Sequence, residues 1–354
     1  MIRSGTAFGR YLDNCDQPIM SYKLLCLENP LLDIQVNGSK ELLEKYGLKD
    51  NDAVLAEDKH NGIYDEIIKN NQPKFLAGGS AQNTARGAQY MLPPNSTVFI
   101  GCVGEDQYAK QLQEVNEREG LHTEYLVDKS APTGRCGVIV TGHNRSMCTD
   151  LAAANNYKLE HLTSPKVWNI VEQAQFYYVG GFHLTVCPPA IMALGKEAAA
   201  KNKVFAMNIS APFIAQFFKE PMDQTTPYCD YVFGNESEAM AFSESHGFNT
   251  KDITAIAQKI SQLPKVNEKR PRHVVITQGT DPTIVATYSS GTDVQVRTYP
   301  VHAVAGSDIV DTTGAGDSFA GGFMAALVLG KPVEQCVDYG HWLASWTVRV
   351  DGPA

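Results

Sequence analysis

VDTTGAGDSFAGGF, the stretch from Val310 to Phe323, joins a glycine turn to a predicted helix. The turn, Gly314–Gly316, consists of small residues that allow the backbone to approach a ligand closely. Apolar residues then recur at helical spacing, at Phe319, Phe323, Ala326 and Leu327, before a stop at Gly330 and Pro332. The N-terminus of a helix offers free N–H groups and the positive end of its dipole, so this segment predicts an anion site. Asp317 lies inside that site, where its negative charge would repel a phosphate.

Two interpretations of Asp317 are open at this point. As a general base, it would accept the proton of a hydroxyl nucleophile, while the N–H groups of Gly314, Ala315 and Gly316 bind the charge on a transferring phosphoryl group. As a structural residue, it would cap a helix after a glycine turn. A G-A-G turn, an acid and several compatible motifs in one chain favour the general base.

The composition is that of a globular protein with a large core. The chain has 354 residues, of which 43% are hydrophobic and 19% are charged, and its net charge is −9. This acidic balance disfavours nucleic acid and anionic membranes as partners. No apolar run approaches the roughly 20 residues that span a bilayer. Residues 1–20 lack the apolar segment of a signal peptide, and we expect them to form a disordered extension ahead of a fold over 21–354.

The eight cysteines are scattered along the chain, without a C-x-x-C pair or a zinc-type cluster with histidine. An even count leaves disulfides open, but a chain of this length does not need them for its stability. We therefore expect reduced thiols in a cytosolic protein.

Strand-like apolar runs alternate with amphipathic stretches over most of the chain. The runs that predict strands are Lys23–Leu27, Ser96–Val103, Cys136–Thr141, Phe176–Gly180, Val204–Ile209, Tyr231–Gly234, His273–Thr277 and Thr283–Tyr288. The stretches that predict helices are Gly79–Met91, Gln107–Glu119, Pro188–Lys201, Glu236–Ser245 and Asp252–Leu263. This order predicts an α/β fold with a mostly parallel sheet covered on both faces, whose ligands bind at the carboxyl ends of the strands. Two segments that fit the alternation poorly, about 31–79 and 131–155, are expected to form a small β-rich lid.

Polar residues follow the first predicted strand and precede the first long helix. In ENPLLDI (28–34), Asn29 and Asp33 could bind neighbouring hydroxyls of a sugar, because a carboxylate forms strong hydrogen bonds with a diol. On that segment alone, a turn with a side-chain cap is the favoured interpretation. In AGGSAQN (77–83), Gly79 precedes a helix whose first turn carries Ser80 and Asn83, which suits a small polar ligand and an ordinary capped helix equally well.

Three further motifs carry candidate nucleotide contacts. Asn235 and Glu238 in FGNESE share one helical face, where they could organise a hydrated Mg²⁺ ion and phosphates or simply cap the helix. Thr277 and Gly279 in TQG could contact a nucleotide, although a hairpin loop is the favoured interpretation in isolation. Arg145 in HNRS would be a solvated surface charge, unless its loop belongs to a lid and it contacts a phosphate in transfer.

Together, DTTGAGDSFAGGF (311–323) and AGGSAQN (77–83) resemble the motifs of the ribokinase-like family of sugar and nucleoside kinases. The similarity extends in order through ENPLLDI, LAEDKH, NRS…LAAAN, NISAPFI, FGNESE and TQG, and it is closest to the members that act on adenosine. The resemblance implies a three-layer α/β/α domain with a mostly parallel central sheet and a small β-rich lid. It also implies Mg²⁺-dependent transfer of the γ-phosphoryl group of ATP to the 5′-hydroxyl of adenosine, giving AMP and ADP in purine salvage.

Roles are implied by the positions that match the family motifs. Asp317 matches the catalytic base, Gly314, Ala315 and Gly316 match the anion hole, and Arg145 matches a phosphate contact. The positions that match the nucleoside site are Asn29, Leu31, Asp33, Leu55, Gly79, Ser80, Asn83, Met147, Leu151, Phe182 and His183. The positions that match the nucleotide site are Asn235, Glu238, Thr277, Gly279 and Thr313, with Asn235 and Glu238 holding Mg²⁺ through water.

Three positions depart from the family pattern, and one of them, Gly306, stands where a side chain near the nucleotide is expected. Thr313 stands where mammalian-type enzymes have asparagine, so we expect altered nucleotide contacts. His183 replaces a second aromatic residue, so we expect a more polar base pocket that tolerates other purine nucleosides. The resemblance also implies a monomer in the cytoplasm, and in the nucleus as well, with small-molecule partners and no nucleic acid or membrane partner.

Other functions stay open on sequence alone. A kinase of another purine nucleoside, or of a sugar such as ribose or fructose, would use the same aspartate, although the apolar residues around Leu55 and Met147 favour a base as well as a sugar. A nucleoside-binding protein without catalysis would not need Asp317, the glycine turn and the N-x-x-E pair together. A nicotinamide-dependent dehydrogenase is disfavoured because no G-x-G-x-x-G follows the first strand.

Overall fold

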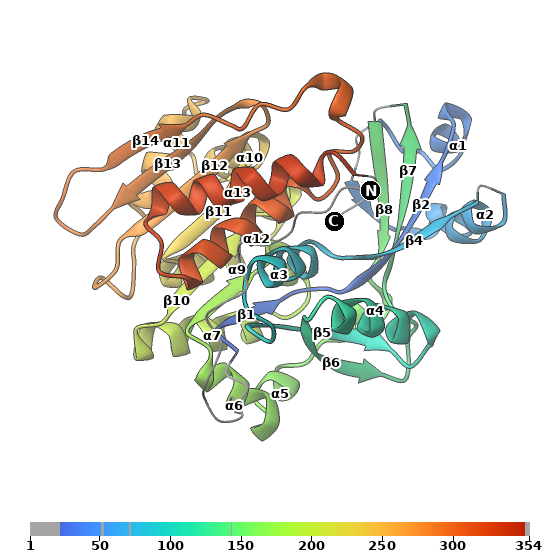
Figure 1. Ribbon diagram of the computed structural model, residues 1–354, viewed down its shortest axis with the longest axis horizontal. Helices are drawn as coiled ribbons and strands as arrows, with labels where there is room; N and C mark the ends of the chain where they lie inside the picture. The colour runs from blue at the N-terminus through green and yellow to red at the C-terminus, as the bar shows by residue number, and fades with distance from the viewer. Residues whose placement is uncertain (1–21, 51–52, 71, 143, 351–354) are drawn as a thin grey trace, which may run out of the picture.

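The computed structural model describes residues 22–50, 53–70, 72–142 and 144–350, so the predicted N-terminal extension (1–20) lies outside the described residues. Its largest element is a nine-stranded sheet (Figure 1). In spatial order the strands are β14 (Gln295–Tyr299), β13 (Asp281–Tyr288), β12 (Arg272–Gln278), β11 (Tyr231–Asn235), β10 (Val204–Asn208), β9 (Phe176–Val179), β1 (Leu24–Leu27), β5 (Thr97–Gly104) and β6 (His122–Asp128). Pairing is parallel from β12 to β6 and antiparallel at β12–β13 and β13–β14, which confirms the predicted mostly parallel sheet.

The central strands are short and apolar because both faces of the sheet are covered. Consecutive residues of β1 point to opposite faces: Leu25 and Leu27 belong to one core cluster, and Leu24 and Cys26 belong to the other. All four side chains are fully buried. The unbroken LLCL run in the sequence therefore reflects a strand without a solvent-facing side.

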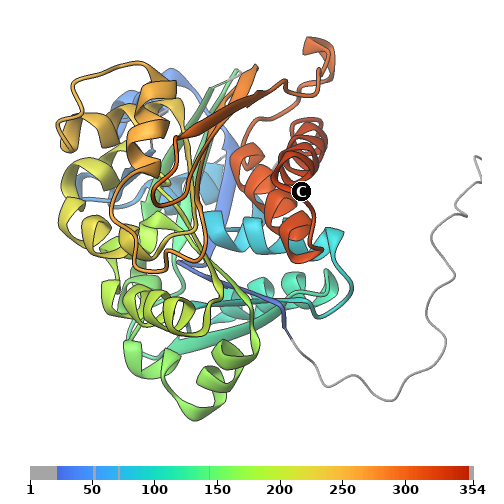
Figure 2. The same ribbon diagram turned by 90° about the vertical axis from the view of Figure 1, so that its left-hand side faces the viewer.

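Helices cover the two faces as separate layers, which Figure 2 shows with the sheet between them. Against one face pack α3 (Ser80–Met91), α12 (Ala315–Val328) and α13 (Val333–Thr347). Against the other pack α5 (Leu159–Leu162), α6 (Pro165–Gln173), α7 (Pro188–Lys201), α8 (Pro212–Phe217), α9 (Lys219–Thr225), α10 (Glu236–Ser245) and α11 (Ile253–Ser261). The result is the expected three-layer α/β/α arrangement. Among the described residues, no helix combines the length and the apolar character needed to cross a bilayer.

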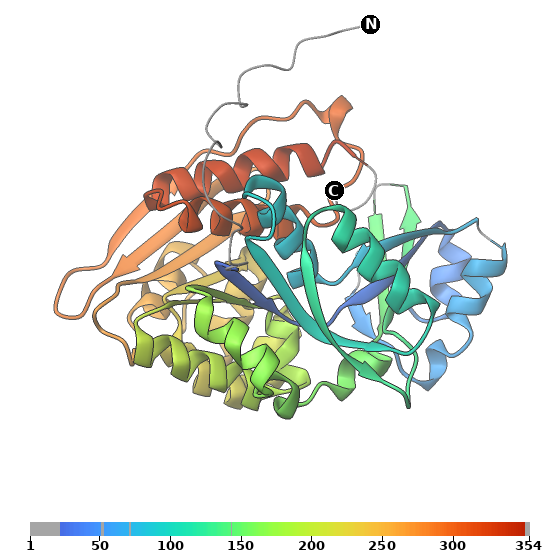
Figure 3. The same ribbon diagram turned by 60° about the horizontal axis from the view of Figure 1, so that its bottom comes forward.

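A second, five-stranded sheet begins directly after β1 and lies at the opposite end of the molecule from β13 and β14 (Figures 1 and 3). Its order is β3 (Ala53–Leu55), β8 (Asn144–Asp150), β7 (Arg135–Thr141), β2 (Leu31–Asn37) and β4 (Lys74–Gly78). The helices α1 (Lys40–Lys45) and α2 (Ile63–Asn70) share an apolar cluster with this sheet. A smaller cluster joins β2, β4 and β5 to α4 (Gln107–Arg118). All five strands fall within the segments 31–79 and 131–155, where the sequence favoured extra strands.

The predicted strands and helices all correspond to structural elements, with ends shifted by at most two residues. One of them, Cys136–Thr141, belongs to the second sheet rather than to the central one. The edge strands β6 and β14 were not predicted, because most side chains of β6 are half-exposed and most of β14 are exposed, so neither has a continuous apolar run. The described cysteines are all free and buried, which agrees with the expected reduced thiols.

The helices α3 and α12 approach each other through glycine. A Cβ atom on Gly321 would lie 2.7 Å from the carbonyl oxygen of Thr84 and 3.0 Å from the backbone nitrogen of Ala88. The two backbones therefore meet without a side chain between them. This contact fixes the first turn of α12, which carries Asp317, relative to the first turn of α3, which carries Ser80.

We expect Gly321→Ala to lower the free energy of unfolding by about 1–3 kcal/mol, because its methyl group overpacks this contact. In a crystal structure of the variant, the distance from Ser80 Oγ to Asp317 Oδ1, 2.7 Å in the wild type, should increase. Gly322→Ala is the matched control: its Cβ would lie 2.5 Å from the carbonyl oxygen of Tyr339 in α13, so it should destabilise α12 without moving α3 away. Wild-type stability in Gly321→Ala would contradict this account.

Candidate active site

A cavity of about 480 Å³ lies between the central sheet and the second sheet. Residues at the carboxyl ends of central strands line it: Glu28 and Asn29 after β1, Ser210 after β10, and Asn235 at the end of β11. The second sheet contributes Asp33 and residues of β3 and β8. The cavity thus occupies the place that parallel α/β sheets use for ligands.

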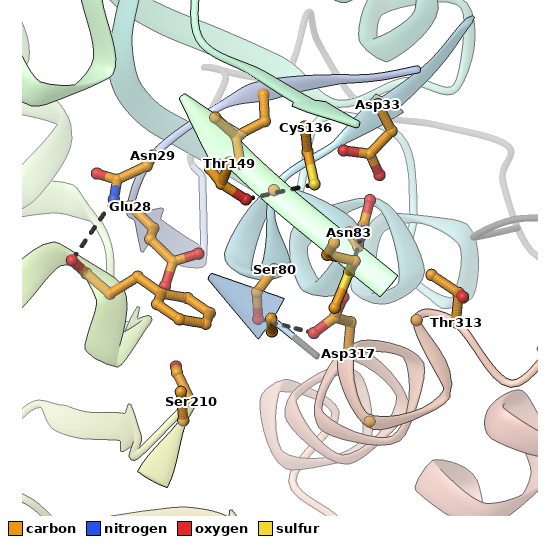
Figure 4. A pocket seen from close by; sticks show the side chains of 18 of the residues that line it. Glu28, Asn29, Asp33, Ser80, Asn83, Cys136, Thr149, Ser210, Thr313 and Asp317 are labelled. Carbon is orange, nitrogen blue, oxygen red and sulfur yellow. Dashed lines mark hydrogen bonds between the residues drawn. The ribbon is translucent and has the colours of Figure 1, made fainter. Parts of the chain in front are cut away.

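Asp317 lies at the base of this cavity, in the first turn of α12. Its Oδ1 accepts a hydrogen bond from Ser80 Oγ (2.7 Å), and its Oδ2 accepts one from Asn83 Nδ2 (3.0 Å). Figure 4 shows both side chains of α3 facing the carboxylate. Burial raises the pKa of Asp317, and the two hydrogen bonds oppose that shift. The carboxylate is therefore oriented, partly buried and open to a ligand.

The glycine turn ahead of Asp317 leaves its backbone accessible. Gly314 has φ +76°, a conformation that glycine adopts without strain, and it caps α12. A Cβ on Gly316 would meet nothing within 4 Å, so the cavity reaches the backbone there. The N–H group of Ala315 donates to the carbonyl of Thr312 (3.2 Å), and Ala315 lies outside the residues that line the cavity. The N–H groups of Gly316 and Asp317, in the first helical turn, have no intrahelical acceptor.

The polar wall beside Asp317 suits a diol. Asp33 of β2 is buried, and burial together with the charge of Asp317 raises its pKa to about 7, against the lowering effect of Arg86. Gly79 has φ +96°, and a Cβ there would lie 2.4 Å from the carbonyl oxygen of Asn29, so only glycine fits this position without strain. Asp33, Asn83 and Gly79 all line the cavity, as the sequence predicted.

Apolar residues from both sheets make up a second part of the cavity lining, the apolar wall. From the second sheet and its flanks it takes Leu31, Val54, Leu55, Met147 and Leu151, and from the central sheet's loops it takes Phe182, Ala211, Pro212 and Phe213. Phe182 and Phe213 contact each other with ring centroids 6.0 Å apart. A flat, apolar ligand group would be covered on two sides here.

Arg145 of β8 lies on the cavity wall and pairs with Asp311, the buried residue at the start of the DTTGAGD motif, at 2.6 Å. Asp311 also accepts a hydrogen bond from the N–H group of Thr313 (2.8 Å). The ion pair therefore joins the second sheet to the loop that precedes α12. Arg145 is not the solvated surface charge considered from the sequence, since its side chain is 13% exposed.

Asn235 and Glu238 bond to each other at the start of α10. The Asn235 side chain accepts from the Glu238 N–H (2.9 Å), and the Glu238 carboxylate accepts from the Asn235 N–H (3.0 Å) and amide (2.9 Å). This is the helix cap that the sequence left open, yet both residues also line the cavity. Burial raises the pKa of Glu238 to about 7, so a cation nearby would favour its charged form.

No group of three or more His, Cys, Asp or Glu side chains able to hold a metal occurs within the described ranges. Asn235 and Glu238 therefore fit a Mg²⁺ ion only through water molecules and phosphate oxygens, which is a common mode for this ion. They face a smaller neighbouring cavity of about 120 Å³, whose lining includes Thr277, Gly316 and Asp317.

Three predicted site residues lie outside the walls of both cavities. Gly279 occupies an exposed turn between β12 and β13, with φ +58°. Ala315 is the first residue of α12, and its N–H group is bonded to the carbonyl of Thr312 in the preceding loop. His183 is fully buried and its Nδ1 bonds to Asn29 Oδ1 (2.9 Å), so the expectation that it makes the base pocket more polar is wrong. Burial lowers the pKa of His183 to about 3, and the neutral ring holds the Asn29 side chain in place.

Other residues of the site were missed from the sequence. Glu28 and Ser210 directly follow predicted central strands, a position that could have identified them. Ser210 has φ +71°, a strained conformation for a non-glycine residue, and its Oγ accepts from the N–H of Gly181 (2.8 Å). Phe213 belongs to NISAPFI, and nothing in that motif by itself indicates its direction.

The raised pKa of Asp33 has a consequence for stability. A carboxyl group with a folded-state pKa near 7 stabilises the fold below its unfolded-state pKa of about 4 and loses that contribution as the pH rises through 7. In the ligand-free protein, we expect Asp33→Asn to raise the free energy of unfolding at pH 8 by on the order of 2 kcal/mol. Urea unfolding between pH 4 and pH 8 measures this, and the gain should grow over that range. Asp293→Asn, in an exposed loop, is the control, and an equal gain there would refute the assignment.

Comparison with known proteins identifies the family. The model of the pfkB family of carbohydrate kinases matches residues 40–354. The adenosine kinase of Schizosaccharomyces pombe is 53% identical over 94% of this chain and 96% of its own length. The crystal structure of Anopheles gambiae adenosine kinase in complex with P1,P4-di(adenosine-5) tetraphosphate superposes with a TM-score of 0.90 at 44% identity, over 93% of this chain and 96% of that one.

A further structure, adenosine kinase from Schistosoma mansoni in complex with adenosine and AMP, superposes with a TM-score of 0.87 at 35% identity, covering 94% of this chain and 96% of that one. These similarities extend over nearly the whole fold, including both sheets, and they confirm the family expected from the motifs. The chain therefore belongs to the pfkB family of carbohydrate kinases and, within it, to the adenosine kinases.

Proposed function

We propose that this protein transfers the γ-phosphoryl group of ATP to the 5′-hydroxyl of adenosine, giving AMP and ADP. One observation carries the proposal: Asp317 accepts hydrogen bonds from Ser80 (2.7 Å) and Asn83 (3.0 Å) in a cavity that is also lined by many apolar residues. The carboxylate suits proton removal from a hydroxyl group, and the apolar wall suits a purine. The kinship with adenosine kinases supports the same substrate.

Asp317 is the general base in this mechanism. Its carboxylate accepts the proton of the 5′-hydroxyl as that oxygen bonds to the γ-phosphorus and the bond from the γ-phosphorus to the bridging oxygen of ADP breaks. A positioned general base contributes roughly 10²–10⁴-fold to the rate. The N–H groups of Gly316 and Asp317, at the positive end of the α12 dipole, stabilise the charge on the transferring group. The glycine turn at Gly314 keeps side chains away from it.

The nucleoside lies between the polar and the apolar walls. We assign the ribose hydroxyls to Asp33, Asn83 and the backbone at Gly79, with Asn29 held beside them by His183. We assign the purine to the apolar wall, where Leu31, Leu55, Met147, Leu151 and Phe182 exclude water. An apolar wall on both sheets favours a nucleoside over a free sugar, which would leave it unfilled.

The nucleotide phosphates approach where the two cavities meet. Asn235 and Glu238, which line both cavities, would hold a hydrated Mg²⁺ ion there. Thr277 and Thr313, which line one cavity each, would contact the nucleotide. When bound, Mg²⁺ supplies positive charge that offsets the charge on the phosphate oxygens. Gly279 shapes the exposed turn at the far side of this site.

The second sheet acts as a lid over the nucleoside in this proposal. Closure brings the apolar residues of β3 and β8 onto the purine. In the same step, Arg145 leaves its ion pair with Asp311 and binds the transferring phosphoryl group. We include in the proposal that the protein works as a monomer in the cytoplasm.

Asp317→Asn should lower kcat for adenosine by about 10²–10⁴-fold, because the amide cannot accept the hydroxyl proton. The affinity for adenosine, measured by calorimetry without ATP, should stay close to that of the wild type, since the amide keeps the shape of the carboxylate. Asp293→Asn, in an exposed loop, is the control for the charge change. A parallel loss of binding and turnover in Asp317→Asn would contradict the role of general base.

The substrate class is measured by ADP formation from ATP and Mg²⁺ in parallel assays with adenosine, inosine, guanosine, ribose and fructose. We expect adenosine to give the highest kcat/KM. A preference for ribose or fructose would keep Asp317 as the base and overturn the assignment of the apolar wall. Tight adenosine binding without turnover of any substrate would replace the proposal by a nucleoside-binding function.

A further inference from the structure

Glu28 is a buried carboxyl group on the cavity floor that the proposed mechanism leaves without a role. It directly follows β1, is 1% exposed and lines the cavity. Its Oε2 accepts a hydrogen bond from the N–H group of Ala81 (2.8 Å), in the first turn of α3. Its Oε1 is buried and makes no hydrogen bond of ordinary geometry among the described residues, although the backbone of Phe182 lies near enough to lower the pKa of the carboxyl group.

The surrounding backbone leaves space for this carboxyl group. A Cβ atom on Gly180, at the end of β9, would lie 1.6 Å from Glu28 Oε1 and 2.1 Å from its carboxyl carbon. Glycine at position 180 is therefore required by the place that Glu28 occupies. The side chain is enclosed from one side by Gly180 and held from the other by Ala81.

The turn of α3 that Glu28 holds is the turn that orients Asp317. Ser80, the residue before Ala81, donates to one oxygen of Asp317, and Asn83 donates to the other. Glu28 thus bonds, through the N–H group of Ala81, to the turn that carries both donors. A shift of this turn would change both hydrogen bonds at once.

We propose that Glu28 is a positioning residue for phosphoryl transfer: its carboxyl group fixes the first turn of α3 and thereby holds Ser80 and Asn83 against Asp317. This inference rests on the proposed function, because it takes Asp317 as the base. The contacts that hold Glu28 come from two distant parts of the chain: the N–H group of Ala81 in α3 bonds to its carboxyl group, and Gly180 after β9 leaves space for it.

The neutral form of Glu28 suits this role. Burial raises its pKa to about 8, and the charge of Asp317 adds to the shift. The other titratable groups that face it are Cys26 of β1 and Tyr178 of β9, whose pKa values are raised by burial and by Glu28 itself, and Asp33 lies across the cavity. The raised pKa favours the protonated form of Glu28 at neutral pH, and ionisation as the pH rises through about 8 adds a negative charge to the cavity wall.

Two substitutions separate the hydrogen bond from the charge. Glu28→Ala removes the acceptor for Ala81, and we expect kcat to fall about tenfold to a hundredfold, as misplaced catalytic groups do, with a smaller change in the KM for adenosine. Glu28→Gln keeps an oxygen for Ala81, so its kcat at pH 7 should stay near that of the wild type. The wild type should lose activity above pH 8, and Glu28→Gln should not.

Gly180→Ala and Glu119→Gln complete the set. Gly180→Ala should displace the Glu28 carboxyl group and lower kcat when it is made in the wild-type sequence. Added to Glu28→Ala, the same substitution should have little further effect on kcat. Glu119→Gln breaks the 2.5 Å ion pair with Arg86 elsewhere on α3. It should lower the free energy of unfolding without changing the dependence of kcat on pH. This control shows whether a general destabilisation of α3 could by itself produce the effects of the Glu28 substitutions.

Hydrogen–deuterium exchange of peptides that cover 79–83 tests the support without any reaction. Exchange should be faster in Glu28→Ala than in the wild type and Glu28→Gln. A wild-type enzyme inactive with adenosine would refute the proposed function, and the exchange rates would still decide the role of Glu28. Unchanged exchange and unchanged kcat in Glu28→Ala, or equal losses in Glu28→Gln and Glu28→Ala, would overturn the inference.

Discussion

The site depends on one contact, the close approach of α3 and α12. Because Gly321 places no side chain between the two backbones, the first turns of the helices lie side by side, and Ser80 and Asn83 reach both oxygens of Asp317. Those residues are 237 and 234 positions apart from Asp317 in the sequence. The central sheet supports this pairing, since both helices pack on the same face of it, and the loops at its carboxyl ends supply the rest of the cavity.

Crowding of carboxyl groups is the second constraint. Burial raises the pKa of Glu28, Asp33, Glu238 and Asp317, and the charge of Asp317 contributes to the shifts of the other three. Such a cluster costs stability in the empty protein, and a bound hydroxyl group or cation relieves it. Substrate binding stabilises the folded protein and so offsets the free energy lost by burying these carboxyl groups. The same reasoning applies to Asp317, the acid in the predicted phosphate site: a bound hydroxyl group beside it relieves the cost of its burial.

The central strands and the helices α3, α7, α10, α11 and α12 could be predicted from sequence because each carries its own local signal: an unbroken apolar run such as Leu24–Leu27, or a glycine turn before a helical stretch such as α12. The helix α13, which also packs on the central sheet, was not predicted. The edge strands β6 and β14 lack that signal. Within the site, Asp317, Ser80, Asn83 and Asp33 could be predicted from motifs. The partners of buried groups could not, since the bonds of His183 to Asn29 and of Arg145 to Asp311 join segments more than 150 residues apart. The position of Glu28 after the first strand could have marked it as a site residue, but its contacts could not be predicted, because Ala81 and Gly180 become its neighbours only through folding.

The most direct test of the account is the identity of the phosphorylated product. Phosphorus-31 NMR of a reaction with adenosine, ATP and Mg²⁺ shows which oxygen of the ribose carries the new phosphate, through its coupling to the ribose protons. The account predicts one AMP for each ADP, with the phosphate coupled to the two 5′ protons. ADP formed without AMP, or a phosphate on the 2′ or 3′ oxygen, would contradict the placement of the 5′-hydroxyl beside Asp317.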